Sequence, residues 1–194
     1  SKNNYICAVC ADSTAFGLCL CDISTGEVYA SSFPVAEEGL GHLQNELARF
    51  HPAEAVLSSG AWNTDGLVPF LKDRLGCLCE NGGEARFRVG AARPLAEKQF
   101  KTGLNGIPVQ DEAALQAVGG LLAYLYETQK TDLSHISALT YYTAGQFMEL
   151  DLTARQTLEL TATMRGKEKR GSLLWVLDKT KTAMGGRLLR AWME

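Results

Sequence analysis

The sequence predicts an α/β fold, in which a three-stranded antiparallel meander is extended by parallel strands and flanked by helices, followed by a helical segment. Two observations lead to this class. Three short apolar runs at the start of the chain are joined by turns rich in Asp, Ser, Thr and Gly, as in a strand meander. Beyond Pro34 the apolar residues recur at helical spacing, and another apolar run follows at residues 54–59.

The first half of the chain alternates between strand and helix patterns. In order, the expected elements are strands at 4–11, 15–22 and 27–33, a helix at 40–50, a strand at 54–59, a helix at 67–75 and a strand at 86–89. The order β-β-β-α-β-α is that of ribonuclease-H-like folds, in which parallel strands extend a meander. We therefore expect that topology here.

A longer helix is expected over residues 111–126, with Leu115, Val118, Leu122 and Leu125 along its apolar stripe. Gly119 and Gly120 lie in its middle, where each costs about 1 kcal/mol relative to Ala. The pair therefore predicts close packing of this helix against a neighbour.

The boundary between two domains is expected in the linker that follows this helix. We divide the chain into residues 1–135 and 136–194, with an extended stretch at 146–151, a helix over 152–164 and a loop from Arg165 to Ser172 in the second part.

Length, composition and charge bound the class of protein. The chain has 194 residues, 46% hydrophobic residues, a mean hydropathy of -0.07 and a net charge of -3. A chain of this length is ample for one domain with a core and short for two full ones, and its acidic balance argues against a dedicated nucleic-acid-binding protein. No apolar run approaches the roughly 20 residues that span a bilayer, and no signal-peptide pattern is present. We expect a cytoplasmic protein without membrane contact.

The six cysteines fall in three pairs, Cys7 with Cys10, Cys19 with Cys21, and Cys77 with Cys79. The first spacing could be half of a zinc site. The other pairs are spaced by one residue within apolar runs, so both members of a pair face one side of a strand. Reduced core cysteines are the favoured interpretation, and no metal site is predicted.

Catalysis of nuclease type needs several carboxylates that converge on two metal ions. The first expected strand carries no acid, the fourth ends in Ser58 and Ser59, and Asp12 and Asp22 lie at turns, where Asp bonds to the backbone. Glu46 on the first helix would have no partner carboxylates. The three histidines are scattered, at positions 42, 51 and 135, and are expected at the surface or at helix ends. A nuclease or a stand-alone nucleic-acid-binding adaptor remain the alternatives.

Two stretches near the end of the chain raise the question of phosphate binding. No Walker A motif is present, because Lys179 and Lys181 precede the glycine pair at 185–186 instead of following it. One dense basic cluster could contact a DNA backbone, although Glu168 interrupts it and a solvated loop is the simpler interpretation. Its members are Arg165, Lys167, Lys169 and Arg170.

Three stretches, in the same order, resemble the MutS family of DNA mismatch repair proteins. Residues 173–192, "LLWVLDKTKTAMGGRLLRAW", closely resemble a hallmark of the family. Residues 150–161, "LDLTARQTLELT", resemble the entry into its core domain, and "DISTGE" at 22–27 resembles the start of its connector domain. The resemblance covers nearly the whole chain.

The resemblance implies a connector domain at residues 1–135 and the start of a helical core domain at 136–194. Such a module is non-catalytic. It couples recognition of mismatched double-stranded DNA to the ATPase domains and offers a docking surface for a MutL-like protein, for which we expect exposed faces between about Pro94 and Tyr126. The mismatch-reading wedge would precede Ser1, and ATP and Mg would bind beyond Glu194, so no cofactor is expected here. The first residue is Ser and the last lies within an expected leucine-rich helix, which suits a fragment of a longer protein. The resemblance further implies that the full-length protein forms a homodimer.

The final stretch is then expected to pack domains together. Thr182 suits the N-cap of a last helix, and Gly185 and Gly186 lack the side chains that would keep two helices apart. The predicted interdomain packing residues are Leu177, Asp178, Thr182, Met184, Gly185, Gly186, Leu188, Leu189 and Trp192.

Overall fold

The structure, a computed structural model, describes residues 4–100, 107, 111–129 and 132–143. The chain divides into two compact units, one formed by residues 1–47 and 51–142 and the other by 48–50 and 143–194. The unit that contains the sheet thus runs to Tyr142, and the domain boundary between 135 and 136 stays a prediction. The expected elements at 146–151 and 152–164 and the loop from Arg165 lie outside the described residues.

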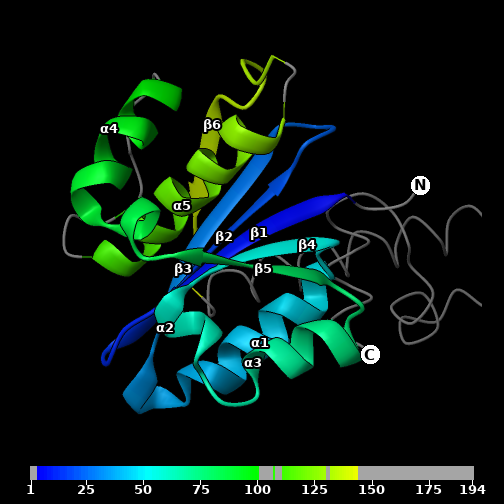
Figure 1. The fold of residues 1–194 in the computed structure, drawn as a ribbon. Helices are drawn as coiled ribbons and strands as arrows, with labels where there is room; N and C mark the ends of the chain where they lie inside the picture. The colour runs from blue at the N-terminus through cyan, green and yellow to red at the C-terminus, as the bar shows by residue number, and fades with distance from the viewer. Residues whose placement is uncertain (1–3, 101–106, 108–110, 130–131, 144–194) are drawn as a thin grey trace, which may run out of the picture. The chain divides into compact units, whose positions relative to one another are not determined.

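A six-stranded sheet forms the centre of the first unit (Figure 1). The first three strands are the predicted antiparallel meander, β1 (Tyr5–Ala11), β2 (Ala15–Asp22) and β3 (Glu27–Pro34). The other three strands, β4 (Glu54–Ser58), β5 (Leu78–Gly83) and β6 (Ala138–Tyr141), are parallel to β1, β4 and β3 respectively. The strand order is β5-β4-β1-β2-β3-β6, so the prediction of a meander extended by parallel strands is confirmed.

Helices cover both faces of this sheet. One face carries α4 (Val89–Gln99) and α5 (Glu112–Thr128), and the other carries α1 (Gly39–Phe50), α2 (Ser59–Trp62) and α3 (Leu67–Pro69), as Figure 1 shows. Three short helical turns complete the element order: η1 (Val35–Glu37), η2 (Phe70–Arg74) and η3 (Ala85–Phe87). Because both faces are covered, β1 and β2 are buried along nearly their whole length.

The strand predicted at residues 86–89 is wrong. Phe87 ends the turn η3 and inserts its ring beneath α5, and Arg88 is the N-cap of α4. The alternation of Arg, Phe, Arg and Val imitates a strand, but here it marks a single buried aromatic residue before a helix. Helix α4 and strands β5 and β6 have no counterpart among the predicted elements.

The two glycines of α5 have the predicted role. A Cβ on Gly119 would lie 2.2 Å from the Cβ of Ala92 on α4, and one on Gly120 would lie 2.2 Å from the Phe87 ring. Both are far inside ordinary carbon–carbon contact. The glycine pair therefore allows α4 and η3 to approach the middle of α5.

All six cysteines are free, five are buried and Cys79 is partly exposed. Cys10, Cys19 and Cys21 lie in the core beneath α4 and α5. Cys7 is three residues from Cys10 along β1, so its side chain points to the opposite face of the sheet and the two cannot share a metal. Burial raises the pKa of Cys10 and of Cys21 to about 12, as expected for inert core thiols.

Candidate interaction surface

The carboxyl ends of β1 and β4 are where a two-metal nuclease would need its acids, and here they carry backbone contacts. The Ser58 hydroxyl accepts hydrogen bonds from the backbone N–H of Ala61 (3.2 Å) and of Ala11 (3.3 Å). A Cβ on Gly60 would lie 2.2 Å from the Ala11 carbonyl oxygen, so the two chain segments touch directly. The space between these strand ends is occupied by backbone.

The two aspartates of the meander lie in turns, as predicted. Asp12 Oδ1 accepts from the backbone N–H groups of Thr14 (2.7 Å) and Ala15 (3.0 Å), and Asp22 Oδ1 accepts from the N–H (3.0 Å) and hydroxyl (2.6 Å) of Ser24. Burial opposes the ionisation of Asp12, but the hydrogen bonds from Thr14 and Ala15 outweigh it and hold the pKa of Asp12 below its ordinary value. Both carboxylates fix hairpin geometry.

Glu46 is buried on α1. Among the described residues, no group of three or more His, Cys, Asp or Glu side chains could hold a metal ion. Those helices that the structure describes also lack the length and hydrophobicity that crossing a bilayer requires.

The three histidines are exposed, as predicted. His51 ends α1 with a left-handed backbone conformation (φ 48°), and His42 lies on the exposed face of the same helix. His135 Nε2 lies 2.6 Å from the carbonyl oxygen of Ile23. A carbonyl can only accept, so Nε2 carries the proton in this contact.

One side chain, Gln99 at the end of α4, links α4 to α5 and to the turn at 132–136. Its Oε1 accepts from the Tyr126 hydroxyl (2.5 Å), and its Nε2 donates to the carbonyl oxygens of Leu133 (3.0 Å) and Ile136 (2.6 Å). Asp132 in turn accepts from the N–H and hydroxyl of Ser134 (both 2.9 Å). These contacts hold three separate segments in one exposed arrangement, which we name the α4–α5 surface.

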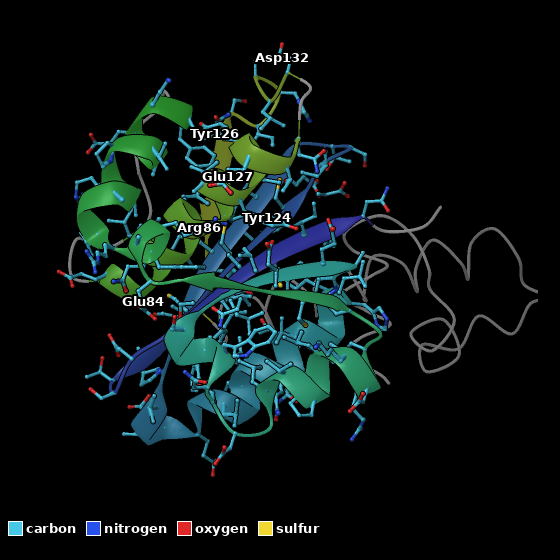
Figure 2. The ribbon with its side chains drawn as sticks, viewed as in Figure 1. Glu84, Arg86, Tyr124, Tyr126, Glu127 and Asp132 are labelled. Carbon is cyan, nitrogen blue, oxygen red and sulfur yellow. The ribbon has the colours of Figure 1, made fainter. Side chains whose placement is uncertain are left out.

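Charged and aromatic side chains, among them Arg86, Tyr126 and Glu127, lie on the α4–α5 surface (Figure 2). Arg86 and Glu127 form an ion pair of 3.0 Å across it. Tyr126 is 40% exposed although its hydroxyl is bonded, and partial burial raises its pKa. An aromatic ring that is held in place yet open to solvent is typical of residues that anchor protein interfaces.

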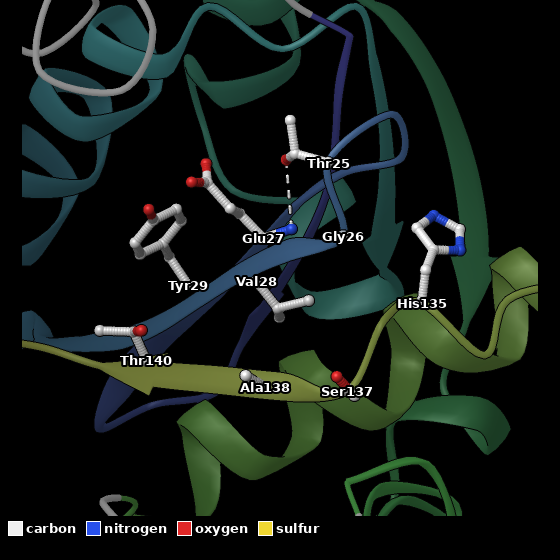
Figure 3. Close-up of a pocket in the computed structure, with 9 residues that line it drawn as sticks. All are labelled: Thr25, Gly26, Glu27, Val28, Tyr29, His135, Ser137, Ala138 and Thr140. Atoms are coloured by element: carbon white, nitrogen blue, oxygen red, sulfur yellow. Dashed lines mark hydrogen bonds between the residues drawn. The ribbon is translucent and has the colours of Figure 1, made fainter.

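A hollow of about 310 Å³ lies beside the paired strands β3 and β6 (Figure 3). Its walls include Thr25, Glu27, His135, Ser137 and Thr140. Thr25 Oγ1 accepts from the N–H of Glu27 (3.3 Å), so this hydroxyl is already used within the hairpin turn.

The predicted docking region from Pro94 to Tyr126 overlaps the α4–α5 surface at the end of α4 and at the end of α5. Gln99, Arg86 and Glu127, which hold the surface together, were not singled out from the sequence, because their partners are 27 to 41 residues away or lie on another element. The predicted interdomain packing residues between Leu177 and Trp192 lie outside the described residues. So does the basic cluster Arg165, Lys167, Lys169 and Arg170.

The chain matches two models of known protein families. The family model MutS domain II matches residues 4–137, and the model MutS domain III matches residues 153–194. The chain belongs to the MutS family. The two matches follow one another in the order that the resemblance in the sequence implies.

Curated relatives named DNA mismatch repair protein MutS align with 99–100% of this chain. It is 39% identical over 193 residues to the DNA mismatch repair protein MutS of Ruminiclostridium cellulolyticum, covering 100% of the chain and 22% of that protein. It is 38% identical over 193 residues to that of Symbiobacterium thermophilum (99% and 22%) and 35% identical over 194 residues to that of Caldanaerobacter subterraneus (100% and 22%). The chain spans about a fifth of the length of the curated relatives it matches.

Proposed function

We propose that this chain is the connector and the start of the core of a DNA mismatch repair protein. In this role it is non-catalytic, couples recognition of mismatched DNA to ATPase domains and offers a docking surface for a MutL-like protein. The observation that carries the proposal is the match of MutS domain II to residues 4–137, followed by domain III. The relatives are named as DNA mismatch repair proteins, which supports the pathway.

The same proposal extends to the fold and to the whole protein. A ribonuclease-H-like fold is supported by the order β5-β4-β1-β2-β3, with an antiparallel meander and two parallel strands on one side. For the full-length protein we propose a cytoplasmic homodimer that acts on mismatched double-stranded DNA, with ATP and Mg bound outside these residues.

A non-catalytic role is supported by the way in which this fold uses its acids. Asp12 and Asp22 each accept several hydrogen bonds within a hairpin turn, and Ser58 and the backbone of Gly60 stand at the strand ends where a nuclease would need carboxylates. The net charge of -3 likewise disfavours a stand-alone nucleic-acid-binding adaptor.

The α4–α5 surface is the docking site that the described residues support best. It combines the exposed ring of Tyr126 with charges of both signs, and Gln99 holds its three segments in place without a bound partner. A surface that is already ordered loses less conformational entropy when a partner binds.

Capture of a MutL-like protein by the full-length protein tests the docking site. Glu127→Lys, in the presence of ATP and mismatched DNA, is expected to reduce capture at least tenfold, because it reverses a charge beside Tyr126. Losing the exposed ion pair with Arg86 changes folding stability by about 1 kcal/mol or less. Asp73→Lys is the matched control, since it is the same kind of reversal on the exposed turn η2 on the other side of the sheet. Equal capture by wild type and Glu127→Lys, in crosslinked complexes as well, would contradict this assignment.

A further inference from the structure

The first turn of α5 is tied to two strands through a single carboxylate. Asp111 is the N-cap of α5, and its Oδ1 accepts from the N–H of Ala114 (3.1 Å). Its Oδ2 accepts from the Ser32 hydroxyl on β3 (2.7 Å) and from the Tyr141 hydroxyl on β6 (2.6 Å). We call Asp111, Ser32 and Tyr141 the Asp111 cluster. It joins residues that lie 30 and 79 positions apart in the sequence.

The strand that this cluster holds is short and lies at an edge of the described sheet. β6 has four residues and alternates between exposed and partly exposed positions. Among the strands that the structure describes, it lies at the edge of the sheet and pairs with β3 alone. Figure 3 shows Ala138 and Thr140 of β6 beside the β3 residues Val28 and Tyr29. Just after β6, the backbone N–H of Tyr142 donates to the Ala30 carbonyl oxygen (3.0 Å), and the backbone carbonyl oxygen of Tyr142 accepts from the Ser31 hydroxyl (2.7 Å). Leu139 packs against the core, and Ile136 and Tyr142 on either side of β6 are buried. A short edge strand still opens at a lower free energy than a central one, so side-chain hydrogen bonds add to how firmly β6 is held.

The helix end that the cluster caps lies directly against the sheet. A Cβ on Gly17 of β2 would lie 2.0 Å from the Ala113 carbonyl oxygen, and the Cys10 thiol donates to that same oxygen (3.2 Å). The first turn of α5 therefore has no room to shift unless its contacts with the strands change.

The two functions of Asp111 depend on one another. Burial and the hydrogen bond to Asp111 raise the pKa of Tyr141 to about 12, so the hydroxyl keeps its proton at neutral pH and donates it to the carboxylate. When β6 leaves the sheet, the carboxylate loses a donor that orients it towards Ala114. When the first turn of α5 opens, Tyr141 loses its acceptor.

We propose that the Asp111 cluster is a latch that couples attachment of β6 to order in the first turn of α5. The functional consequence rests on the proposed function, because α5 contributes Tyr126 and Glu127 to the α4–α5 surface. β6 is the last strand that the structure describes, and the residues that match MutS domain III follow it along the chain. By linkage, a docked partner that favours an ordered α5 also favours attached β6, and release of β6 weakens docking by the same factor.

Hydrogen exchange of the 194-residue chain, measured by mass spectrometry without any partner, tests the latch. Tyr141→Phe removes one hydroxyl and keeps the ring. We expect about tenfold faster exchange both at 138–142 and at 112–116, since a hydrogen bond to a charged group is worth roughly that factor. Ser32→Ala removes the hydroxyl of β3 that donates to the Asp111 carboxylate, and it is expected to speed exchange in the same two segments. Stability against urea, measured on each variant, separates local opening from global unfolding.

Tyr126→Phe is the matched control for the helix, because it removes the same hydroxyl from α5 itself but leaves the hydrogen bonds of Asp111 in place. It is expected to leave exchange at 112–116 unchanged. The latch is refuted if Tyr141→Phe speeds exchange at 138–142 alone, or if Tyr126→Phe has the same effect at 112–116. Because no partner is present, failure here leaves the docking experiment with Glu127→Lys unaffected, and failure of docking leaves the exchange result unaffected.

Discussion

Replacing Gly119 by Ala is expected to destabilise the chain, although Ala is the most favourable residue inside a helix. The new methyl group would lie 2.2 Å from the Cβ and 2.3 Å from the Cα of Ala92. Carbon atoms in contact prefer about 3.5–4 Å, so α4 must move away by more than ~1 Å. Inserting a methyl group into a packed site costs about 1–3 kcal/mol, and the gain in helix propensity returns about 1 kcal/mol.

Since one clashing atom belongs to the backbone of α4, the upper end of that range applies. The expected net loss is then about 2 kcal/mol, measured as the change in the free energy of unfolding in urea. For a chain of this size the corresponding fall in Tm is about 4–8 °C. Gly41→Ala is the control, because Gly41 lies in α1 with no atom within 4 Å of the position of a Cβ. That substitution is expected to stabilise the chain by up to about 1 kcal/mol.

A double variant sharpens the test. Ala92→Gly removes the nearer of the two clashing atoms, so Gly119→Ala combined with Ala92→Gly is expected to lose less stability than the sum of the two single losses. The reasoning fails if Gly119→Ala is as stable as the wild-type chain, or if the two substitutions are additive.

Three further predictions concern titration, thiol reactivity and capping. Cys79 is expected to react with iodoacetamide faster than the other five cysteines in the native chain. The reason is that a hydrogen bond with Cys77 and then the charge of Lys72 lower the pKa of Cys79, which is also partly exposed. Equal rates for all six cysteines, measured by peptide mapping, would contradict this. Tyr141 has a pKa of about 12 in the fold and 10.0 ordinarily, so its contribution to stability is present below pH 10 and lost as the pH rises towards 12. Unfolding curves should therefore fall more steeply in this range for wild type than for Tyr141→Phe, and parallel curves would refute the assignment. Ser58→Ala leaves two backbone N–H groups without their acceptor and is expected to cost about 1–2 kcal/mol in urea unfolding, whereas a loss below ~0.5 kcal/mol would show that the cap is unimportant.

The elements that could be predicted from the sequence are those with strong local signals. The meander has turn residues at fixed places, and Asp12 and Asp22 form the turn contacts expected of them. Helix α5 has a long apolar stripe, and its glycine pair indicates the close neighbours that the structure shows, Ala92 of α4 and Phe87 of η3.

The elements that were missed have weak or misleading local patterns. Helix α4 contains Pro94 and mostly small or charged residues, and only Ala92 and Ala96 are buried on it. β5 reads "LCENGG", with few β-forming residues, and is held by pairing with β4. β6 is four residues long, and its partner Glu27 lies 111 positions before Ala138. Such strands form because a sheet edge is available, which is a property of the tertiary fold.

The candidate site was likewise predictable in part: its region followed from the sequence, but its internal contacts did not. The region from Pro94 to Tyr126 followed from family resemblance, and it includes Tyr126 and Gln99. The geometry that holds the surface depends on contacts between Gln99 and the turn at 132–136, and on the pair Arg86–Glu127. No periodicity or motif marks such contacts, because each joins one residue on one element to one residue on another.

Helix α5 is held in two physically different ways, and this difference decides where it can respond to a partner. Its middle is fixed by close packing alone, of Gly119 against Ala92 and of Gly120 against the buried Phe87 ring. Its first turn also packs against Gly17 of β2, but it is held in addition by the hydrogen bonds of Asp111, which are directional and can be exchanged for water. Close packing resists small displacements, whereas a hydrogen-bonded end has two distinct states, bonded and open. A signal that passes through this domain is therefore expected to act at the Asp111 end of α5 and not at its glycine pair.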